Sequence, residues 1–369
     1  MFDSLLQASA LPNWHPALVH LPIVCLPLAA AFDALGLINR RATTWTSPAA
    51  TTIYGLAGLG AALAVWSGRQ AADTLVGIPA KAQPLIGVHS DWAHYALYAT
   101  AVLAVLRIAI QWKEGGKDHL GIRALHLLFA VGAVLVMIRV ADLGGRLVYG
   151  HGLGVAPPPV EEPVPDDDPA QEEPPAASMS ALDRLREAAD GGLEWLPRRG
   201  DHDALQTVLT PAPGTSPAIT LVPGDDPQAK GLQLAVDGNG TFFLPGTFGD
   251  VQIDIGLDLS DFEGTVRLIH HAQGETQGDL TISHQGEAVL NDERDGKQKV
   301  LDRQSFEVPT TPFVLAVSSS GKHLKGLLDG RMIAHGHIAP GPDGACGIGI
   351  DGKGTLHIQS MKIQPLEAH

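Results

Sequence analysis

The first 156 residues alternate between long apolar runs and short polar segments. The four runs cover residues 17–38, 49–66, 92–112 and 122–142. Each is close to the roughly 20 apolar residues that a helix needs to cross a bilayer. The pattern predicts a four-helix transmembrane domain over residues 1–156, with the lipid bilayer as its immediate partner.

The second run is rich in small residues, with Gly55, Gly58 and Gly60 at helical spacing. Small side chains let membrane helices approach one another closely. They would equally let a flat cofactor approach the backbone. We expect close helix packing at this stripe, with a cofactor wall as the alternative.

The pattern changes completely after residue 156. Residues 157–177 are dominated by proline and acidic side chains, a composition typical of an extended linker. Residues 178–191 have apolar positions at helical spacing, so we expect a short leading helix there. From about Trp195 short apolar stretches alternate with period two between turn residues, which predicts an all-β sandwich of the jelly-roll type within residues 178–369.

Charge separates the same two halves. Residues 1–156 carry a formal charge of +3 and residues 157–369 carry −18, while the mean hydropathy of the whole chain is only +0.09. The acidic half argues against a nucleic-acid partner, because phosphate binding needs clustered Lys and Arg. The two cysteines, Cys25 and Cys346, fall in different halves, and we expect them not to form a disulfide.

The basic residues also predict an orientation. Arg40 and Arg41 follow the first apolar run, and Lys113, Lys117 and Arg123 follow the third. The positive-inside rule places both of these loops in the cytoplasm. We therefore expect the N-terminus and the C-terminal β-sandwich domain to lie on the outer side of the membrane, which is the periplasmic side of a bacterial inner membrane.

Histidines gather at the predicted outer end of the bundle. His15 and His20 lie at the start of the first run, His89 and His94 at the start of the third, and His151 after the fourth. A spacing of five residues corresponds to roughly 7.5 Å along a helix. Two pairs at two matched depths are therefore expected, namely His15 with His89 and, deeper, His20 with His94.

Two imidazoles on facing helices are the ligand set of a b-type haem, and they also suit copper or zinc. We expect the deeper pair, His20 and His94, to be the axial or metal ligands. The remaining histidines would serve as propionate partners, proton acceptors or a separate metal site, and two arginines would pair with propionates. The alternative is that these histidines are solvated or cap helices. The additional candidate residues are His15, His89, His151, Arg139 and Arg146.

Three further polar residues lie within the runs toward their predicted inner ends. Asp33 and Arg107 have opposite charge, and we expect them to pair across the bundle or to reach the interface. His126 is expected to be structural. Polar groups at membrane depth are costly, so each of these is also a functional hypothesis.

The first half resembles a bacterial family of four-helix membrane proteins of unknown function. The resemblance covers residues 11–155 and is carried by HPALVHLPI at residues 15–23 and by GGRLVYGHGLGV at residues 144–155. It implies the four-helix fold and a role for the opening histidines. Haem binding and partnership with cytochromes are suspected in this family.

Residues 218–366 resemble a laminin-G or concanavalin-like jelly roll, through an apolar strand, a DG hairpin, a G-x-G-I strand and a final alternating strand. Such domains bind sugars or proteins, and some hydrolyse glycosides. Strand acids are usually solvated, so we expect binding and not hydrolysis. The acids considered are Asp254, Asp258, Asp261, Glu287 and Glu293.

Two histidine segments of this half, His270–His271 and His335–Gly336–His337, are expected to be exposed strand residues, with metal binding as the alternative.

Three functional hypotheses follow from the sequence. The first is an electron-transfer subunit that binds haem b and contacts respiratory or cytochrome subunits. The second is a non-enzymatic anchor that displays a glycan- or protein-binding sandwich, and the third is a copper- or zinc-binding membrane protein. An enzymatic role is left open, and a binding or electron-transfer role is preferred over a stand-alone enzyme.

Overall fold

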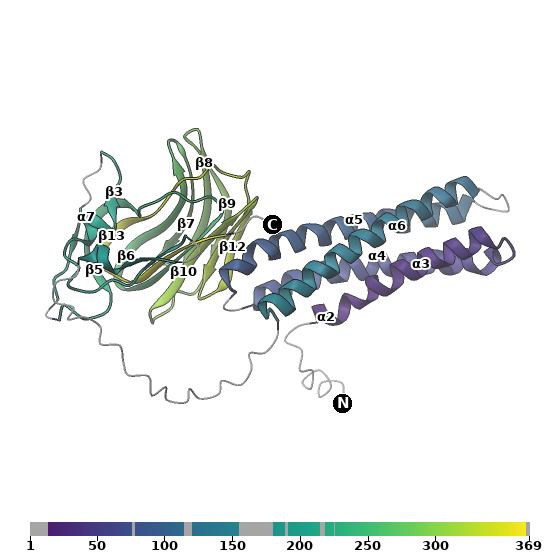
Figure 1. Cartoon of the computed structure of the whole chain (residues 1–369), viewed down its shortest axis with the longest axis horizontal. Coiled ribbons are helices and arrows are strands. Elements are labelled where there is room, and N and C mark those ends of the chain that lie inside the picture. The colour runs from purple at the N-terminus through teal and green to yellow at the C-terminus, as the bar shows by residue number, and fades with distance from the viewer. Residues whose placement is uncertain are drawn as a thin grey trace, which may run out of the picture. The chain divides into compact units, whose positions relative to one another are not determined.

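The computed structural model describes residues 14–75, 78–113, 120–154, 180–188, 191–214, 218–224 and 226–366. The chain divides into two compact units, shown in Figure 1. One unit comprises residues 1–75 and 85–156, and the other comprises residues 76–84 and 157–369. The acidic linker over residues 157–177 lies outside the described residues.

The first unit is a bundle of four long apolar helices. The candidate membrane spans are 24 to 33 residues long, enough to cross a bilayer, which confirms the predicted helices. All four extend beyond the apolar runs, because polar residues at the helix ends continue the backbone hydrogen bonding. The helices are α2 (His15–Leu18), α3 (His20–Ile38), α4 (Thr43–Thr74), α5 (Gln83–Lys113) and α6 (Leu120–Gly145), followed by a π-helical turn, η2 (Arg146–Gly150).

Small residues bring these helices together. A Cβ atom on Gly58 would lie 3.5 Å from the Cβ of Ala104, and one on Gly60 would lie 2.9 Å from Leu21. The buried core of the bundle is correspondingly rich in alanine. Gly58 and Gly60 of the α4 stripe therefore serve close helix packing, whereas a Cβ on Gly55 would meet no neighbour within 4 Å.

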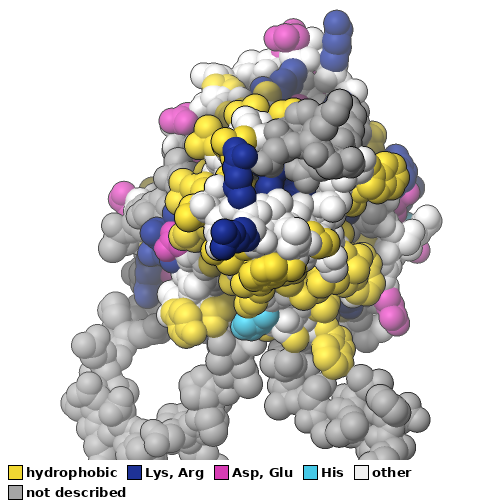
Figure 2. All heavy atoms as spheres, turned by 90° about the vertical axis from the view of Figure 1, so that its right-hand side faces the viewer, with side chains coloured by type: hydrophobic (Ala, Val, Ile, Leu, Met, Phe, Trp, Pro, Cys, Tyr) yellow, Lys and Arg dark blue, Asp and Glu magenta, His cyan; other side chains and the backbone are white. Residues whose placement is uncertain are grey.

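The outside of the bundle is apolar. Val24, Leu128 and Phe129 are 58%, 66% and 61% exposed. Figure 2 looks onto the end of the bundle where α3 joins α4 and shows Lys and Arg side chains among hydrophobic ones. Arg40 and Arg41 are both exposed in this connection. An apolar belt with charged residues at its ends is the surface expected of a membrane domain.

The second unit is an antiparallel β-sandwich (Figure 1). Its strands, as far as the described residues show, are β1 (Leu185–Glu187), β2 (Leu193–Trp195), β3 (Thr210–Pro211), β4 (Ile219–Leu221), β5 (Leu232–Phe243), β6 (Val251–Gln273), β7 (Thr276–Ser283), β8 (Glu287–Arg294), β9 (Lys297–Ser305), β10 (Phe313–Ser320), β11 (His323–Leu328), β12 (Arg331–His337) and β13 (Ala345–Pro365).

Two long strands, β6 and β13, belong to both layers. The first part of β6 pairs with β10 and its second part pairs with β7, while β13 pairs with β6 along almost its whole length. Both strands bend where they pass from one layer to the other, and glycines lie at this bend. Gly264 pairs with Gly352, and a Cβ on Gly354 would lie 2.2 Å from the carbonyl oxygen of Asp261. The sequence predicts separate strands at residues 251–257 and 265–269, whereas the structure has one strand bent at Gly264.

The sandwich core is made of aliphatic and aromatic side chains from both layers. A Cβ on Gly326 of β11 would lie 2.7 Å from Leu280 of β7, so the two layers are in direct contact. Cys346 is buried in the sandwich and Cys25 in the bundle, and both are free thiols, as expected.

The short leading helix expected over residues 178–191 is not an α-helix. A 3-10 turn, η4 (Ala181–Arg184), runs directly into strand β1. Asp203 holds this turn by accepting a hydrogen bond from the Ala181 amide, and Leu185 pairs with Trp195 of β2. Pairing with β2, which itself pairs with β13, thus overrides the local helical periodicity.

Candidate functional site

At the histidine end of the bundle, the two residues of the expected shallow pair pack against different helices. His15 Nδ1 lies 3.0 Å from the carbonyl oxygen of Ala64 and 3.2 Å from Ser67 Oγ, both on α4. A Cβ on Gly144 of α6 would lie 3.2 Å from His89 Cε1, and His89 Nδ1 is buried. His15 thus packs on α4 and His89 on α6, and their pairing stays a prediction.

The deeper pair is arranged differently. His20 is exposed on α3. His94 Nδ1 lies 2.7 Å from the carbonyl oxygen of Ser90, and its Nε2 lies 3.0 Å from the guanidinium of Arg69. Both ring nitrogens of His94 are thus engaged, so the ring as placed does not fit a haem or metal ligand. That role stays a prediction, and it would require the contact with Arg69 to break.

The arginines expected to pair with propionates have a protein partner. Asp142 accepts from Arg139 at 2.7 Å and from Arg146 at 3.1 Å, on an exposed face of α6 and η2. His151 is half-buried after η2. The two arginines thus form a local ion-pair network with Asp142.

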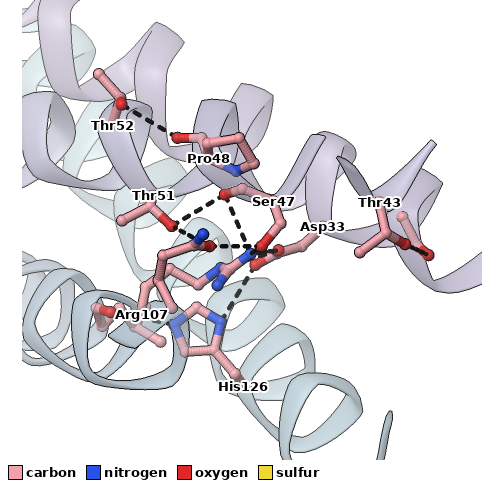
Figure 3. Close-up of polar contacts among 11 residues, drawn as sticks. Asp33, Thr43, Ser47, Pro48, Thr51, Thr52, Arg107 and His126 are labelled. Atoms are coloured by element: carbon pink, nitrogen blue, oxygen red, sulfur yellow. Dashed lines mark hydrogen bonds and ion pairs between the residues drawn. The ribbon is translucent and has the colours of Figure 1, made fainter. Parts of the chain in front are cut away.

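The opposite end of the bundle contains a buried charge cluster, drawn in Figure 3. Arg107 of α5 donates to Asp33 of α3, with both its Nε and its Nη2 at 3.0 Å from the carboxylate. Both side chains are essentially inaccessible to solvent. The expected Asp33–Arg107 pair is confirmed, and it links α3 to α5 across the bundle.

His126 of α6 completes the cluster (Figure 3). Its Nε2 lies 3.1 Å from the carbonyl oxygen of Leu103, and its Nδ1 lies 3.4 Å from Asp33 Oδ2. A carbonyl oxygen accepts only, so Nε2 must carry a hydrogen. Nδ1 faces the Asp33 carboxylate, so His126 connects α6 to the ion pair between α3 and α5.

Hydroxyl and amide groups of α4 and α5 surround the cluster. Arg107 Nη2 donates to Ser47 Oγ at 2.9 Å, and Ser47 Oγ donates to Gln111 Oε1 at 2.6 Å. Tyr54 is fully buried and lies edge-on to the His126 ring, with ring centroids 5.0 Å apart. Sequence inspection identified the charged pair and missed these neighbours, because Ser and Gln in a helix carry no signal of their partners.

The sandwich offers a different kind of surface, the face of β5, β13, β6, β7 and β8 that points away from the core. Leu268 and Leu280 are cross-strand partners facing the core, so Arg267 and Thr281, also partners, face outward. Asp279 accepts hydrogen bonds from Thr281 Oγ1 at 2.7 Å and from Asn291 Nδ2 at 2.9 Å. We call these side chains the polar face.

Beside the polar face, two glycines of β13 leave the backbone without a side chain of its own. Gly347 pairs with Phe243 on one side and Ile269 on the other, and Gly349 pairs with Arg267. A Cβ on Gly349 would lie 2.7 Å from Arg267 Nε, and one on Gly347 would lie 2.8 Å from the Phe243 ring. An arginine and an aromatic ring therefore lie across the backbone of β13, and both are half-buried.

The carboxylates considered for hydrolysis have structural partners. Glu287 pairs with Arg303 at 2.7 Å, and Glu293 accepts from Gln277 at 2.8 Å. A hydrogen bond from the Ser260 amide lowers the pKa of Asp258, and burial raises the pKa of Asp254. Asp261 is exposed. Their contacts favour structural roles over a paired acid and base.

His270 and His271 are buried in the sandwich, which corrects the expectation of exposed strand histidines. Their Nδ1 atoms lie 2.5 Å apart, and His271 has a positive φ of 53°. Burial lowers the pKa of His270 to about 3 and also lowers the pKa of His271. Both rings are therefore neutral at neutral pH. A hydrogen on one Nδ1, donated to the other Nδ1, accounts for their close approach.

Comparisons with known proteins agree with this division. Residues 12–157 match the model of a family described as "Predicted membrane protein (DUF2231)". No match was found among curated proteins.

Solved structures similar to the sandwich include the carbohydrate binding module CBM66 from Bacillus subtilis, at 15% identity and a TM-score of 0.33, covering 40% of this chain and 96% of that one. A Bacillus subtilis protein of unknown function with a galectin-like fold has 12% identity and a TM-score of 0.34, covering 41% and 90%. The galectin LEC-6 of Caenorhabditis elegans has 16% identity and a TM-score of 0.27, covering 40% and 96%. The N-terminal region of the chain is thus covered by the DUF2231 predicted membrane protein family, and the C-terminal region is a β-sandwich that resembles galectin and carbohydrate-binding-module folds.

Proposed function

We propose that this protein is a membrane-anchored carbohydrate-binding protein, in which the helical bundle holds the chain in the bilayer and the polar face of the sandwich binds a glycan. The observation that carries the proposal is the juxtaposition of Arg267, Thr281 and Phe243 over the bare backbone of Gly347 and Gly349.

The chemistry of a sugar matches this surface. A sugar ring presents hydroxyl groups at its edge and C–H groups on its faces. Arg267 and Thr281 supply donors and an acceptor for hydroxyls, and Phe243 supplies an apolar ring for stacking. Three steps between adjacent strands separate Phe243 from Thr281, roughly 14 Å at a spacing of about 4.8 Å per strand. That length suits a short oligosaccharide.

The polar face is also organised before any ligand arrives. Asp279 and Asn291 are 3% and 6% exposed, and Asp279 fixes the Thr281 hydroxyl by accepting its hydrogen bond. These two residues therefore position Thr281 and do not themselves reach a ligand. A preorganised face loses less side-chain freedom on binding.

A glycan array followed by calorimetry on the full chain in detergent tests the proposal. We expect binding of at least one oligosaccharide, and about 10- to 100-fold weaker binding by Arg267→Ala, the loss expected for a hydrogen bond to a charged group. Arg331→Ala removes an exposed arginine of β12 and should leave binding unchanged. The proposal fails if no glycan binds, or if Arg267→Ala and Thr281→Val bind as tightly as the parent chain.

The electron-transfer hypothesis remains a second proposal for the bundle. Its support is the gathering of histidines at one end of the bundle, where His15 of α2 contacts Ser67 and His94 of α5 contacts Arg69, both on α4. A reduced-minus-oxidised absorption spectrum of the chain, produced with ample haem, tests it directly. A haem band that is lost in His89→Ala would support it, and a flat spectrum would remove it. Binding to respiratory or cytochrome subunits and the periplasmic orientation belong to the same set of untested expectations.

A further inference from the structure

Three histidines converge on the β11–β12 hairpin. His323 is the first residue of β11 and His337 is the last residue of β12, and the two are direct cross-strand partners. His335 lies two residues before His337, so both side chains point to the same side of the strand. The hairpin turn at Asp329 and Gly330 has φ of 48° and 75°, the positive values of a two-residue hairpin turn, and a β-bulge beyond it shifts the pairing by one residue, which sets this register.

The three rings form one compact group. The ring centroids are 4.8 Å apart for His323 and His337, 4.9 Å for His335 and His337, and 5.9 Å for His323 and His335. One nitrogen from each ring lies within 4.8 Å of the others. Zinc–imidazole bonds of about 2.1 Å at tetrahedral angles place ligand nitrogens roughly 3.4 Å apart. Small side-chain rotations would bring the three nitrogens from within 4.8 Å of one another to the roughly 3.4 Å that a zinc ion requires.

Neighbouring groups hold the backbone of the two ligands on β12. The His335 amide donates to Asp302 Oδ2 of β9 at 3.0 Å. A Cβ on Gly336 would lie 2.8 Å from the Leu301 side chain, so β12 packs tightly against β9 between the two histidines. A ligand set on a rigid, supported hairpin loses little freedom on binding an ion.

We propose that His323, His335 and His337 form a binding site for a divalent transition-metal ion of the zinc and copper class. Three imidazoles satisfy a tetrahedral ion at three positions and leave the fourth for water or an exogenous ligand. Hard cations such as Mg²⁺ and Ca²⁺ prefer oxygen ligands and should not bind here. The site uses strands that the polar face does not, so it does not rest on the proposed glycan function.

Metal titration of the full chain tests this inference. The chain is purified without a polyhistidine tag, stripped with a chelator and titrated with Zn²⁺ by calorimetry, in a His15→Ala background to remove the bundle pair. We expect one Zn²⁺ per chain, with His335→Gln and His337→Gln each weakening binding by about 10- to 100-fold. His202→Gln, which removes an exposed histidine elsewhere, should bind as the background chain does.

Copper provides an independent readout. Cu²⁺ bound to the background chain should give an electron paramagnetic resonance spectrum with nitrogen superhyperfine splitting, and His335→Gln should change that splitting. Circular dichroism confirms that the variants keep their β structure. The inference is overturned if no stoichiometric Zn²⁺ binding occurs, or if a folded His335→Gln/His337→Gln double variant binds Zn²⁺ unchanged.

Discussion

The bundle and the sandwich differ most in the side chains that they expose. In the bundle many exposed positions are large and apolar, whereas the charged cluster of Asp33, Arg107 and His126 is buried beside an alanine-rich core. In the sandwich the buried positions are large and apolar, and the polar face points outward. The contrast follows from the solvent. Moving an apolar side chain from lipid into the bundle gains no hydrophobic free energy, so packing and polar contacts must hold a membrane bundle together.

The two units also differ in the contacts that hold their helices or strands together. One charge cluster connects three helices of the bundle, while dozens of apolar contacts share the same task in the sandwich. A bundle built this way should respond sharply to loss of one charge and weakly to changes on its outer surface. The sandwich should respond to loss of core volume and backbone fit.

The largest expected effect is at the buried ion pair. Asp33→Leu alone leaves Arg107 buried without its carboxylate, and we expect a loss of about 3–5 kcal/mol in the free energy of unfolding. The double variant Asp33→Leu/Arg107→Met removes both charges and should recover most of this loss. Denaturant unfolding in detergent measures both. A single variant as stable as the parent chain would contradict the role given to the pair.

A core truncation in the sandwich should rank second. Leu268→Ala removes a fully buried side chain of β6 and should cost about 2–4 kcal/mol through lost burial and the cavity left behind. The matched change on the bundle surface, Val24→Ala, removes a side chain that is 58% exposed and should cost less than about 0.5 kcal/mol. Thermal unfolding of the two variants tests the contrast, and equal losses would refute it.

A smaller effect is expected at the bend of β13. Gly354 has φ of 107°, a conformation that side-chain-bearing residues avoid, and its Cβ would collide with the Asp261 carbonyl. Gly354→Ala should therefore destabilise the sandwich by about 1–3 kcal/mol. Gly274→Ala, at an exposed turn where φ is 59° and a Cβ would meet no atom within 4 Å, is the control that isolates the effect of the collision. The prediction fails if the two substitutions have the same effect.

The smallest expected effect depends on pH. Folding lowers the pKa of His270 from 6.5 to about 3, so between these values the unfolded chain binds more protons and stability falls as pH falls. At pH 5.5 the loss should be about 1 kcal/mol from this residue. His270→Gln should reduce the slope of unfolding free energy against pH between 6.5 and 4. An unchanged slope would show that the ring is not neutral in the fold.

Periodicity was sufficient to predict the two architectures. Runs of about span length predict α3 to α6, and period-two stretches such as residues 251–257 predict strands. The Asp33–Arg107 pair was also predictable, because two opposite charges at membrane depth have few other partners. Local patterns failed where pairing with other strands decides the outcome, as in η4 and β1 and in the continuous strand through Gly264.

The candidate sites were less predictable for the same reason. His335 and His337 stand out as an H-x-H pair, but their closeness to His323 depends on the hairpin register. The engagement of His94 by Arg69 depends on the relative rotation of α4 and α5. A sequence pattern gives the spacing along one element, whereas a site depends on the rotation and register between elements.

The strands β6 and β13, which run through both layers, have a consequence for how the sandwich tolerates change. A cut within either strand would interrupt the strand pairing in both layers at once. Proteolytic nicking or circular permutation there should therefore abolish the fold. The connection between β8 and β9, a tight turn at an outer edge, touches one sheet only. New segments are therefore best grafted at such edges, and split-protein reporters built from this domain should be divided there.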